Sequence, residues 1–297
     1  MRFGAENIMT RWLILLLAAL ALMSGCSSRS SPVRIGDIEM AYQVHGKGPA
    51  LVMIMGFRGT MDVWDPNVIK ALSTHFKVIL FDNRGMGGTT AGNREFTIEQ
   101  FADDATGLLD ALGVDRAHVL GWSMGTEVAL ELTLRHPGKI DKLVLCAGDC
   151  SMQAFPPAPD VLEKLYDTSG SPEEHGKKSL ALMFPQDWLK EHGAYIKEVF
   201  SRPMASSSPE NIRRQAAAMD TWKGCCDRLP QIKTATLLVT GTEDVLTPPQ
   251  NSYMLAKKLP NARLVTFEKA GHGIMYQYPE RFAQIVIGFL EGTSEKQ

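Results

Sequence analysis

The chain has 297 residues, of which 44% are hydrophobic and 22% are charged, the balance of an ordinary globular enzyme. Its formal net charge is −2 and it has no basic run, so the composition gives no reason to expect a nucleic acid as partner. The length suits one large α/β domain with an inserted lid.

Residues 1–25 have the pattern of a signal peptide. The apolar run 12–22 follows Arg11 and is too short for a comfortable membrane span. Met9 also begins a conventional signal, so the sequence leaves the start open between Met1 and Met9.

The end of this segment, Met23-Ser24-Gly25-Cys26, resembles a bacterial lipobox. The resemblance implies cleavage before Cys26, a lipid anchor on that residue and contact with the membrane through the anchor only. Residues 26–33 then form a flexible tether. Ser27, rather than an aspartate, favours the periplasmic face of the outer membrane, so we expect a protein of the bacterial cell envelope. An ordinary cleaved signal with a soluble product is the alternative.

Residues 34–148 predict the first part of the core. An opening hairpin is expected over 35–44, and the apolar run 51–55 predicts a buried strand that ends at Gly56. The backbone amide of Phe57, just past this strand, is a candidate donor to an oxyanion.

The strand predicted at 77–81 leads into a glycine-rich loop at 82–87. Neither the dinucleotide-binding nor the nucleotide-phosphate glycine pattern is present there. We therefore expect Asp82 and Arg84 to make internal polar contacts.

The most informative stretch is Gly121-Trp122-Ser123-Met124-Gly125, between a strand-like and a helix-like run. A Gly-x-Ser-x-Gly pattern places its serine on a strained strand-to-helix turn, where the hydroxyl is exposed to a base and a substrate. The sequence therefore predicts Ser123 as a nucleophile and the Met124 amide as the other oxyanion donor.

A strand at 142–146 precedes a region, 149–229, in which the strand rhythm stops. Helix starts with a serine cap followed by proline occur at Ser171 and Ser208, and we expect a four-helix cap over the site. Five side chains of the cap are candidates to line an apolar pocket, although packing of the cap on the core explains each at least as well: Met152, Phe155, Trp188, Met219 and Trp222. Phe57 and Trp122, next to the reactive residues, are better candidates.

The second part of the core, 230–292, supplies a candidate acid and base; residues 293–297 form a tail. Asp244 follows a strand predicted at 235–240, and His272 follows a strand predicted at 262–267. A carboxylate can hold the imidazole while the imidazole removes the serine proton. Asp149, at the end of the strand 142–146, and Glu243 are the alternative acids.

Taken together, these motifs and their order resemble the α/β-hydrolase superfamily from about residue 35 to 290. The resemblance implies a mostly parallel eight-stranded sheet with helices on both faces and an inserted helical cap. It also implies a triad of Ser123, His272 and Asp244 that acts without metal or organic cofactor. Many relatives carry His-Gly before the oxyanion loop, where this chain has Met55-Gly56.

The expected activity is that of a carboxylesterase. We expect hydrolysis of the ester or lactone bond of a small, largely apolar molecule through an acyl-enzyme intermediate. A carbon–carbon bond hydrolase or a perhydrolase of the same fold is the alternative among enzymes, and a non-catalytic binding lipoprotein is the alternative outside them. The sequence gives no oligomeric state.

Four cysteines remain besides Cys26. In an oxidising compartment Cys150 can bridge to Cys225 or Cys226 and so staple the base of the cap, while Cys146 fits a small buried side chain. The sequence does not choose among the connectivities.

Overall fold

The computed structural model describes residues 31–151, 153–167 and 169–293. The predicted signal peptide, the lipidation site Cys26 and both candidate start residues lie outside the described residues, as does the pocket candidate Met152.

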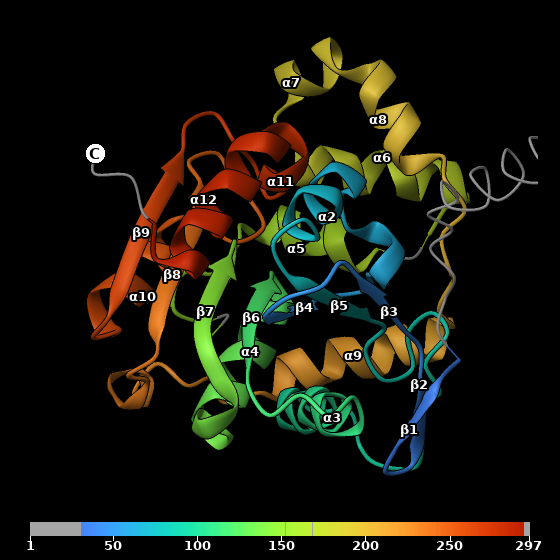
Figure 1. The fold of residues 1–297 in the computed structure, drawn as a ribbon. Coiled ribbons are helices and arrows are strands. Elements are labelled where there is room, and N and C mark those ends of the chain that lie inside the picture. Colours follow the sequence, from blue (N-terminus) through green and yellow to red (C-terminus); the bar gives the residue numbers. More distant parts are fainter. Residues whose placement is uncertain (1–30, 152, 168, 294–297) are drawn as a thin grey trace, which may run out of the picture.

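A seven-stranded sheet lies at the centre of the molecule (Figure 1). Its strands are β3 (Tyr42–His45), β4 (Ala50–Ile54), β5 (Lys77–Phe81), β6 (Ala117–Trp122), β7 (Ile140–Cys146), β8 (Ala235–Gly241) and β9 (Ala262–Phe267). They are ordered β3-β5-β4-β6-β7-β8-β9. β3 is antiparallel to β5 and all other neighbours are parallel, which confirms the predicted mostly parallel sheet.

The predicted number of eight strands is wrong for the described part of the chain. The two preceding strands, β1 (Val33–Ile35) and β2 (Ile38–Met40), form a separate antiparallel hairpin. Their side chains Ile35, Ile38 and Met40 are buried in the hydrophobic core beside the sheet. The hairpin is therefore held by packing and does not extend the sheet.

Helices cover both faces of the sheet. They are α2 (Pro66–Leu72), α3 (Ile98–Ala111), α4 (Met124–Arg135), α10 (Gln250–Lys258), α11 (Ile274–Gln277) and α12 (Pro279–Glu291). Short 3₁₀ helices occur at Met61–Val63, Pro137–Lys139 and Leu229–Gln231.

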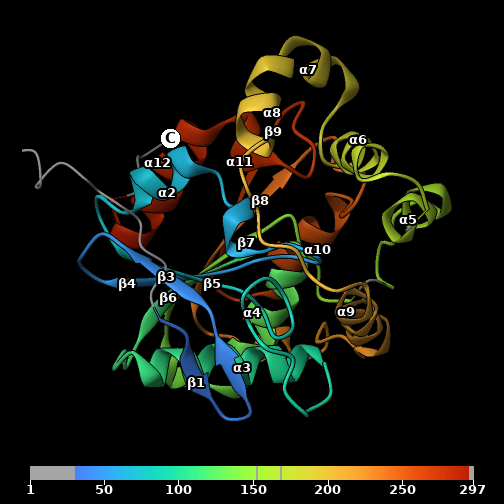
Figure 2. The same cartoon turned by 90° about the vertical axis from the view of Figure 1, so that its right-hand side faces the viewer.

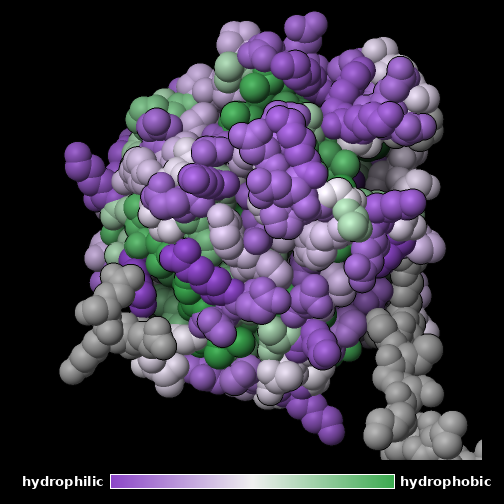
Figure 3. Space-filling view, turned by 90° about the horizontal axis from the view of Figure 1, so that it is seen from above, coloured by the Kyte–Doolittle hydropathy of each residue, from purple (hydrophilic) through white to green (hydrophobic). Residues whose placement is uncertain are grey.

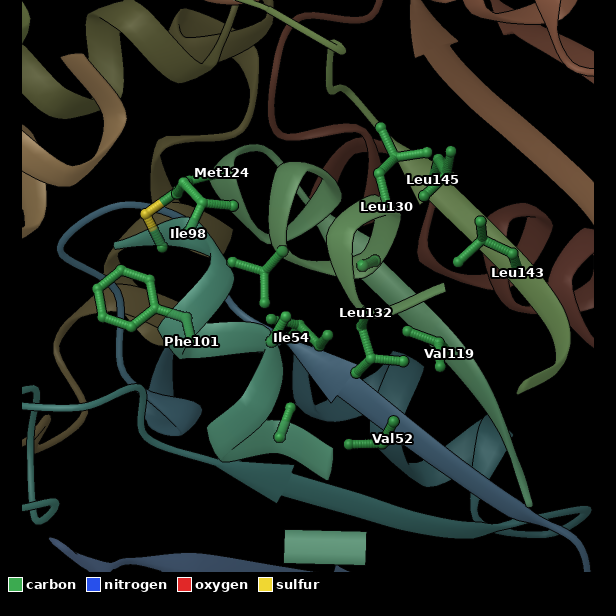
Figure 4. Close-up of a cluster of buried hydrophobic side chains, with 14 of the residues drawn as sticks. Val52, Ile54, Ile98, Phe101, Val119, Met124, Leu130, Leu132, Leu143 and Leu145 are labelled. Atoms are coloured by element: carbon green, nitrogen blue, oxygen red, sulfur yellow. The ribbon is translucent and has the colours of Figure 1, made fainter. Parts of the chain in front are cut away.

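Alternate side chains of a strand point to opposite faces, and each face has its own hydrophobic cluster. Val52 and Ile54 of β4 belong to the first cluster, together with side chains of α3 and α4 (Figure 4). A side chain of α10 also belongs to this cluster. Leu51 and Met53 belong to the second cluster, which includes side chains of α2, α11 and α12. This two-sided burial explains why the central strands read as continuous apolar runs.

The segment between β7 and β8 contains five helices in its described part, one more than the four predicted. They are α5 (Pro159–Tyr166), α6 (Pro172–Met183), α7 (Gln186–Glu191), α8 (Gly193–Phe200) and α9 (Pro209–Thr221). The two predicted starts are confirmed, because Ser171 and Ser208 cap α6 and α9. The prediction missed the break at His192, a single residue that separates α7 from α8.

These five helices, called the insertion below, pack against both sides of the core (Figure 2). Met219 of α9 and the following Trp222 belong to the first cluster. Phe184 and Ile196, from the α6–α8 part, belong to the second cluster.

A disulfide joins Cys150 and Cys226 across the two ends of the insertion, 76 residues apart. It is one of the connectivities that the sequence left open. Cys146 and Cys225 are free and buried, in agreement with the packing role predicted for Cys146.

Hydrophilic side chains dominate the face seen from above, with apolar ones in smaller patches (Figure 3). Within residues 31–293, excluding positions 152 and 168, no helix has both the length and the apolar character of a membrane-crossing segment.

Candidate active site

Ser123 occupies a strained turn between β6 and α4. Its φ is 58° and its ψ is −129°, a backbone conformation that side chains other than glycine rarely adopt. The flanking glycines are sterically required: a Cβ on Gly121 would lie 2.3 Å from the Gly125 oxygen, and one on Gly125 would lie 2.1 Å from the Ile54 oxygen. The predicted strand-to-helix turn at this serine is confirmed.

Asp244 and His272 are brought together by the loops that follow β8 and β9. His272 Nδ1 lies 2.9 Å from Asp244 Oδ2, and the two side chains are 4% and 0% exposed. The other carboxylate oxygen accepts backbone hydrogen bonds from Leu246 and Thr247, at 2.9 and 2.8 Å. The carboxylate is thus fixed, and it favours the tautomer with the proton on Nδ1, which leaves Nε2 free to accept a proton.

The two alternative acids do not take this place. Glu243 is exposed. Asp149 is buried, but its Oδ1 atom has no hydrogen-bond partner. Of the three carboxylates considered from the sequence, only Asp244 is hydrogen-bonded to His272 in the described structure.

Trp122 holds His272 from the other side. Its Nε1 donates to the His272 carbonyl at 3.1 Å, and the two ring centroids lie 5.4 Å apart. The residue before the nucleophile therefore also positions the imidazole.

The turn after β4 passes next to the Ser123 hydroxyl. A Cβ on Gly56 would lie 2.9 Å from the Ser123 Cβ and 3.0 Å from the Trp122 oxygen, so glycine is needed for this close approach. The turn is held by Asn83, which donates to the Met55 carbonyl at 3.0 Å, and by Gln215, which accepts from the Arg58 amide at 2.8 Å. These contacts fix the turn in a chain that has Met55 where many relatives carry histidine.

The glycine-rich loop after β5 has the structural role predicted for it. Arg84 is fully buried and forms ion pairs with Asp37 and Asp104, at 2.9 and 2.7 Å. Asp82 accepts hydrogen bonds from the backbone amides of Met61 and Gly88, at 2.7 and 2.8 Å.

A cavity of about 500 Å³ lies over Ser123, between the core and the insertion. Ser123, His272, Phe57, Met124 and Trp122 contribute to its wall. Apolar side chains make up much of the rest, among them Phe155, Leu180, Leu182, Met183, Phe200, Met219 and Leu246.

Two of the predicted pocket residues lie elsewhere, and the prediction is wrong for them. Trp222 is buried in the first cluster, where its Nε1 donates to Glu131 at 2.9 Å. Trp188 stacks between Phe184 and His192, with ring centroids at 4.9 and 4.4 Å. Each tryptophan contacts side chains that do not line the cavity.

The sequence pattern predicted no role for two polar residues of the cavity wall, Glu127 on α4 and Asn251 on α10, and a third, Asp149 after β7, was considered only as an alternative acid for the triad. Glu127 carried a signal, since it is an acid in a helical run that is otherwise largely apolar. It lies one helical turn after Ser123, on the same face of α4.

Burial raises the pKa of both acids. The pKa of Asp149 is raised to about 6 by burial, against a backbone hydrogen bond from Ser151 and the charge of His272. The pKa of Glu127 is raised well above its usual range by burial and then by the charge of Asp149.

The described residues contain no group of three or more His, Cys, Asp or Glu side chains that could hold a metal ion. The chemistry available from the side chains described above is that of an alcohol, an imidazole and a carboxylate, supported by backbone amides.

Comparison with known proteins identifies the fold family. Residues 49–279 match the family model described as alpha/beta hydrolase fold. The chain is 32% identical over 274 residues to the "Putative carbamate hydrolase RutD" of Caulobacter sp. strain K31, an alignment that covers 87% of this chain and 98% of that protein.

Solved structures give the same fold. A thermophilic esterase from Thermogutta terrifontis superimposes with a TM-score of 0.76 at 24% identity, covering 89% of this chain and 98% of the other. The enol-lactonase from Burkholderia xenovorans LB400 gives 0.75 at 24% identity, covering 88% and 99%. At this level of identity the likeness concerns the fold alone.

Proposed function

The chain belongs to the alpha/beta hydrolase fold family, and on that premise we propose that it is a serine hydrolase that cleaves carboxylic ester or lactone bonds. The observation that carries the proposal is the buried hydrogen bond between Asp244 and His272, because His272 lines the same cavity as Ser123.

In the proposed mechanism, His272 Nε2 takes the proton of the Ser123 hydroxyl as the Ser123 oxygen attacks the substrate carbonyl. Asp244 stabilises the imidazolium that forms. The amides of Phe57 and Met124 bind the oxyanion, the latter at the positive end of the α4 dipole. His272 then gives its proton to the leaving alcohol. In the second half of the reaction, water attacks the acyl-enzyme carbonyl while His272 takes a proton from the water, and His272 returns that proton to the Ser123 oxygen as the acid leaves.

The cavity favours a small substrate with a substantial apolar part, because apolar side chains of the insertion make up much of its wall. Carbamate hydrolysis is the second candidate, favoured by the relative from Caulobacter, because a carbamate carbonyl is attacked by the same groups. A carbon–carbon bond hydrolase or perhydrolase uses the same alcohol and imidazole, and a binding lipoprotein needs neither.

Labelling with a fluorophosphonate probe tests the proposal, together with hydrolysis of p-nitrophenyl acetate and butyrate. The wild-type protein is expected to be labelled and active. Ser123→Ala is expected to lose labelling and to lower kcat by a factor on the order of 10⁶, with little change in melting temperature. Ser201→Ala is the matched control, because Ser201 is exposed at the end of α8 and is not in the cavity wall. An unlabelled wild-type protein would favour the binding lipoprotein, and unchanged turnover in Ser123→Ala would refute the nucleophile.

We further propose that the enzyme works in the bacterial cell envelope, anchored through a lipid on Cys26. The support is the lipobox-like sequence described above. In a bacterial host, Cys26→Ser is expected to move the protein from the membrane fraction to the soluble fraction without changing its specific activity. A wild-type protein that is soluble after signal cleavage would contradict the anchor.

A further inference from the structure

Three residues that line the cavity each have a buried side-chain oxygen atom with no hydrogen-bond partner in the described structure. The atoms are Glu127 Oε2, Asp149 Oδ1 and Asn251 Oδ1. Their residues are 2%, 8% and 1% exposed, respectively. Buried polar atoms in a folded protein are normally paired, so three orphans around one cavity indicate a partner that enters from outside the chain.

The amide orientation of Asn251 is fixed, which makes it an observation independent of the two acids. Its Nδ2 donates to the Phe155 carbonyl at 2.8 Å, and a carbonyl oxygen could not accept from the amide oxygen. The atom left without a partner is therefore an acceptor, like those of the two carboxyl groups.

The cationic residues of the cavity wall are engaged elsewhere. Lys164 Nζ pairs with Asp160 at 2.8 Å, and Arg58 donates from its guanidinium to the Leu165 carbonyl at 3.4 Å. The neutral His272 is hydrogen-bonded to Asp244. Among the described residues, neither Glu127 nor Asp149 forms an ion pair. Burial raises the pKa of Asp149 to about 6, so Asp149 carries a negative charge at neutral pH.

We propose that Glu127, Asp149 and Asn251 form a subsite that binds a protonated primary amine of the substrate. An ammonium group has three N–H donors and no acceptor, and so it complements acceptor atoms beside a negative charge. Glu127 lies four residues after Ser123, a rise of about 6 Å along α4, which places the amine several bonds from the carbonyl under attack. The inference rests on the proposed serine hydrolase and names its substrate class: an amino-substituted acyl compound with a methylene chain that fits the apolar wall.

The first test compares two esters of the same shape. We expect the wild-type kcat/KM for p-nitrophenyl 6-aminohexanoate to exceed that for p-nitrophenyl heptanoate by about tenfold or more, the effect of one charge-assisted hydrogen bond. Glu127→Gln with Asp149→Asn is expected to remove this preference, so that the ratio of the two constants falls to about one or below. Glu198→Gln, at an exposed acid of α8 outside the cavity wall, is the matched control and should retain it.

The second test does not depend on turnover. In calorimetric titration of the Ser123→Ala protein, hexylammonium should bind more tightly than hexanamide. Addition of Glu127→Gln and Asp149→Asn to this protein should abolish the binding of hexylammonium. Stronger binding of hexanamide would overturn the ammonium assignment in favour of a neutral N–H donor. No binding of hexylammonium, with a wild-type preference for the heptanoate ester, would overturn the subsite. If neither ester is cleaved but hexylammonium binds, the proposed hydrolase fails and the amine subsite stands.

Discussion

The loops after β7 and β8 start side by side in the sheet, and each places a buried aspartate in or beside the cavity. In the β8 loop, both oxygens of Asp244 have partners within the chain: two backbone amides and His272. In the β7 loop, Asp149 keeps one oxygen without a partner. A carboxylate that must hold an imidazole is fully satisfied before the substrate arrives, whereas one that recognises a substrate keeps a free acceptor.

The largest expected difference between the two loops is in turnover. Asp244→Asn should lower kcat on an apolar ester by a factor on the order of 10⁴, because the amide favours the wrong imidazole tautomer. Steady-state kinetics of Asp244→Asn and Asp149→Asn on p-nitrophenyl butyrate measure the contrast. If Asp149→Asn is the more damaging substitution, the assignment of the acid is reversed.

The second difference is in stability, because the β7 loop alone is tied to the far end of the insertion. Cys226→Ser is expected to lower the free energy of unfolding by about 4.5 kcal/mol, the loop-closure value for a bridge of this span. Urea unfolding with and without reductant measures this contribution. Reductant should lower the free energy of unfolding of the wild type and leave that of Cys226→Ser unchanged. Cys225→Ala is the control, since Cys225 is free and its variant should remain sensitive to reductant. Equal stability of Cys226→Ser and wild type would contradict a closed bridge.

The smallest expected effect is a pH dependence of the free energy of unfolding, caused by Asp149. Its pKa is raised to about 6 in the folded protein, so the folded state holds this proton more tightly than the unfolded state does. Stability from this group is therefore lost as pH rises from about 4 to 6, by about 2 to 3 kcal/mol. Asp37 acts at more acidic pH and in the opposite direction, because Arg84 lowers its pKa.

Urea unfolding of wild type and Asp149→Asn at pH 4.5 and 7.5 checks this sign. The variant should gain stability relative to the wild type at the higher pH. A relative gain at the lower pH would show that Asp149 is stabilised as a carboxylate by a contact within the chain.

The sequence was sufficient for the reactive end of the cavity, because its residues follow strand ends in short local patterns. The turn at Ser123 is dictated by two glycines, and Asp244 and His272 each come directly after an apolar strand. Parallel strands bring such positions to one edge of the sheet, so chain order predicts their proximity.

At the other end of the cavity, only Asp149 follows a strand end, and that pattern did not distinguish it from a triad acid. Glu127, Asp149 and Asn251 come from two helices and a loop, and only the packing of α4 and α10 on the sheet places them around one space. Trp222 was misplaced for the same reason, because its partner Glu131 is 91 residues away in the chain. The pattern of the opening segment likewise does not reveal what it packs against, and in the structure β1 and β2 lie outside the main sheet.

The insertion shares its apolar residues with both hydrophobic clusters of the core. Removing the insertion to make a smaller enzyme would take Trp222 out of the first cluster, which also contains Val52 and Leu132. It would take Phe184 out of the second cluster, which also contains Tyr276 and Phe282. Recombination between relatives would therefore have to exchange the insertion together with the parts of the two hydrophobic clusters on which it packs. Changes of substrate range in this lineage are more accessible by point substitution around the cavity than by loss or replacement of the whole segment.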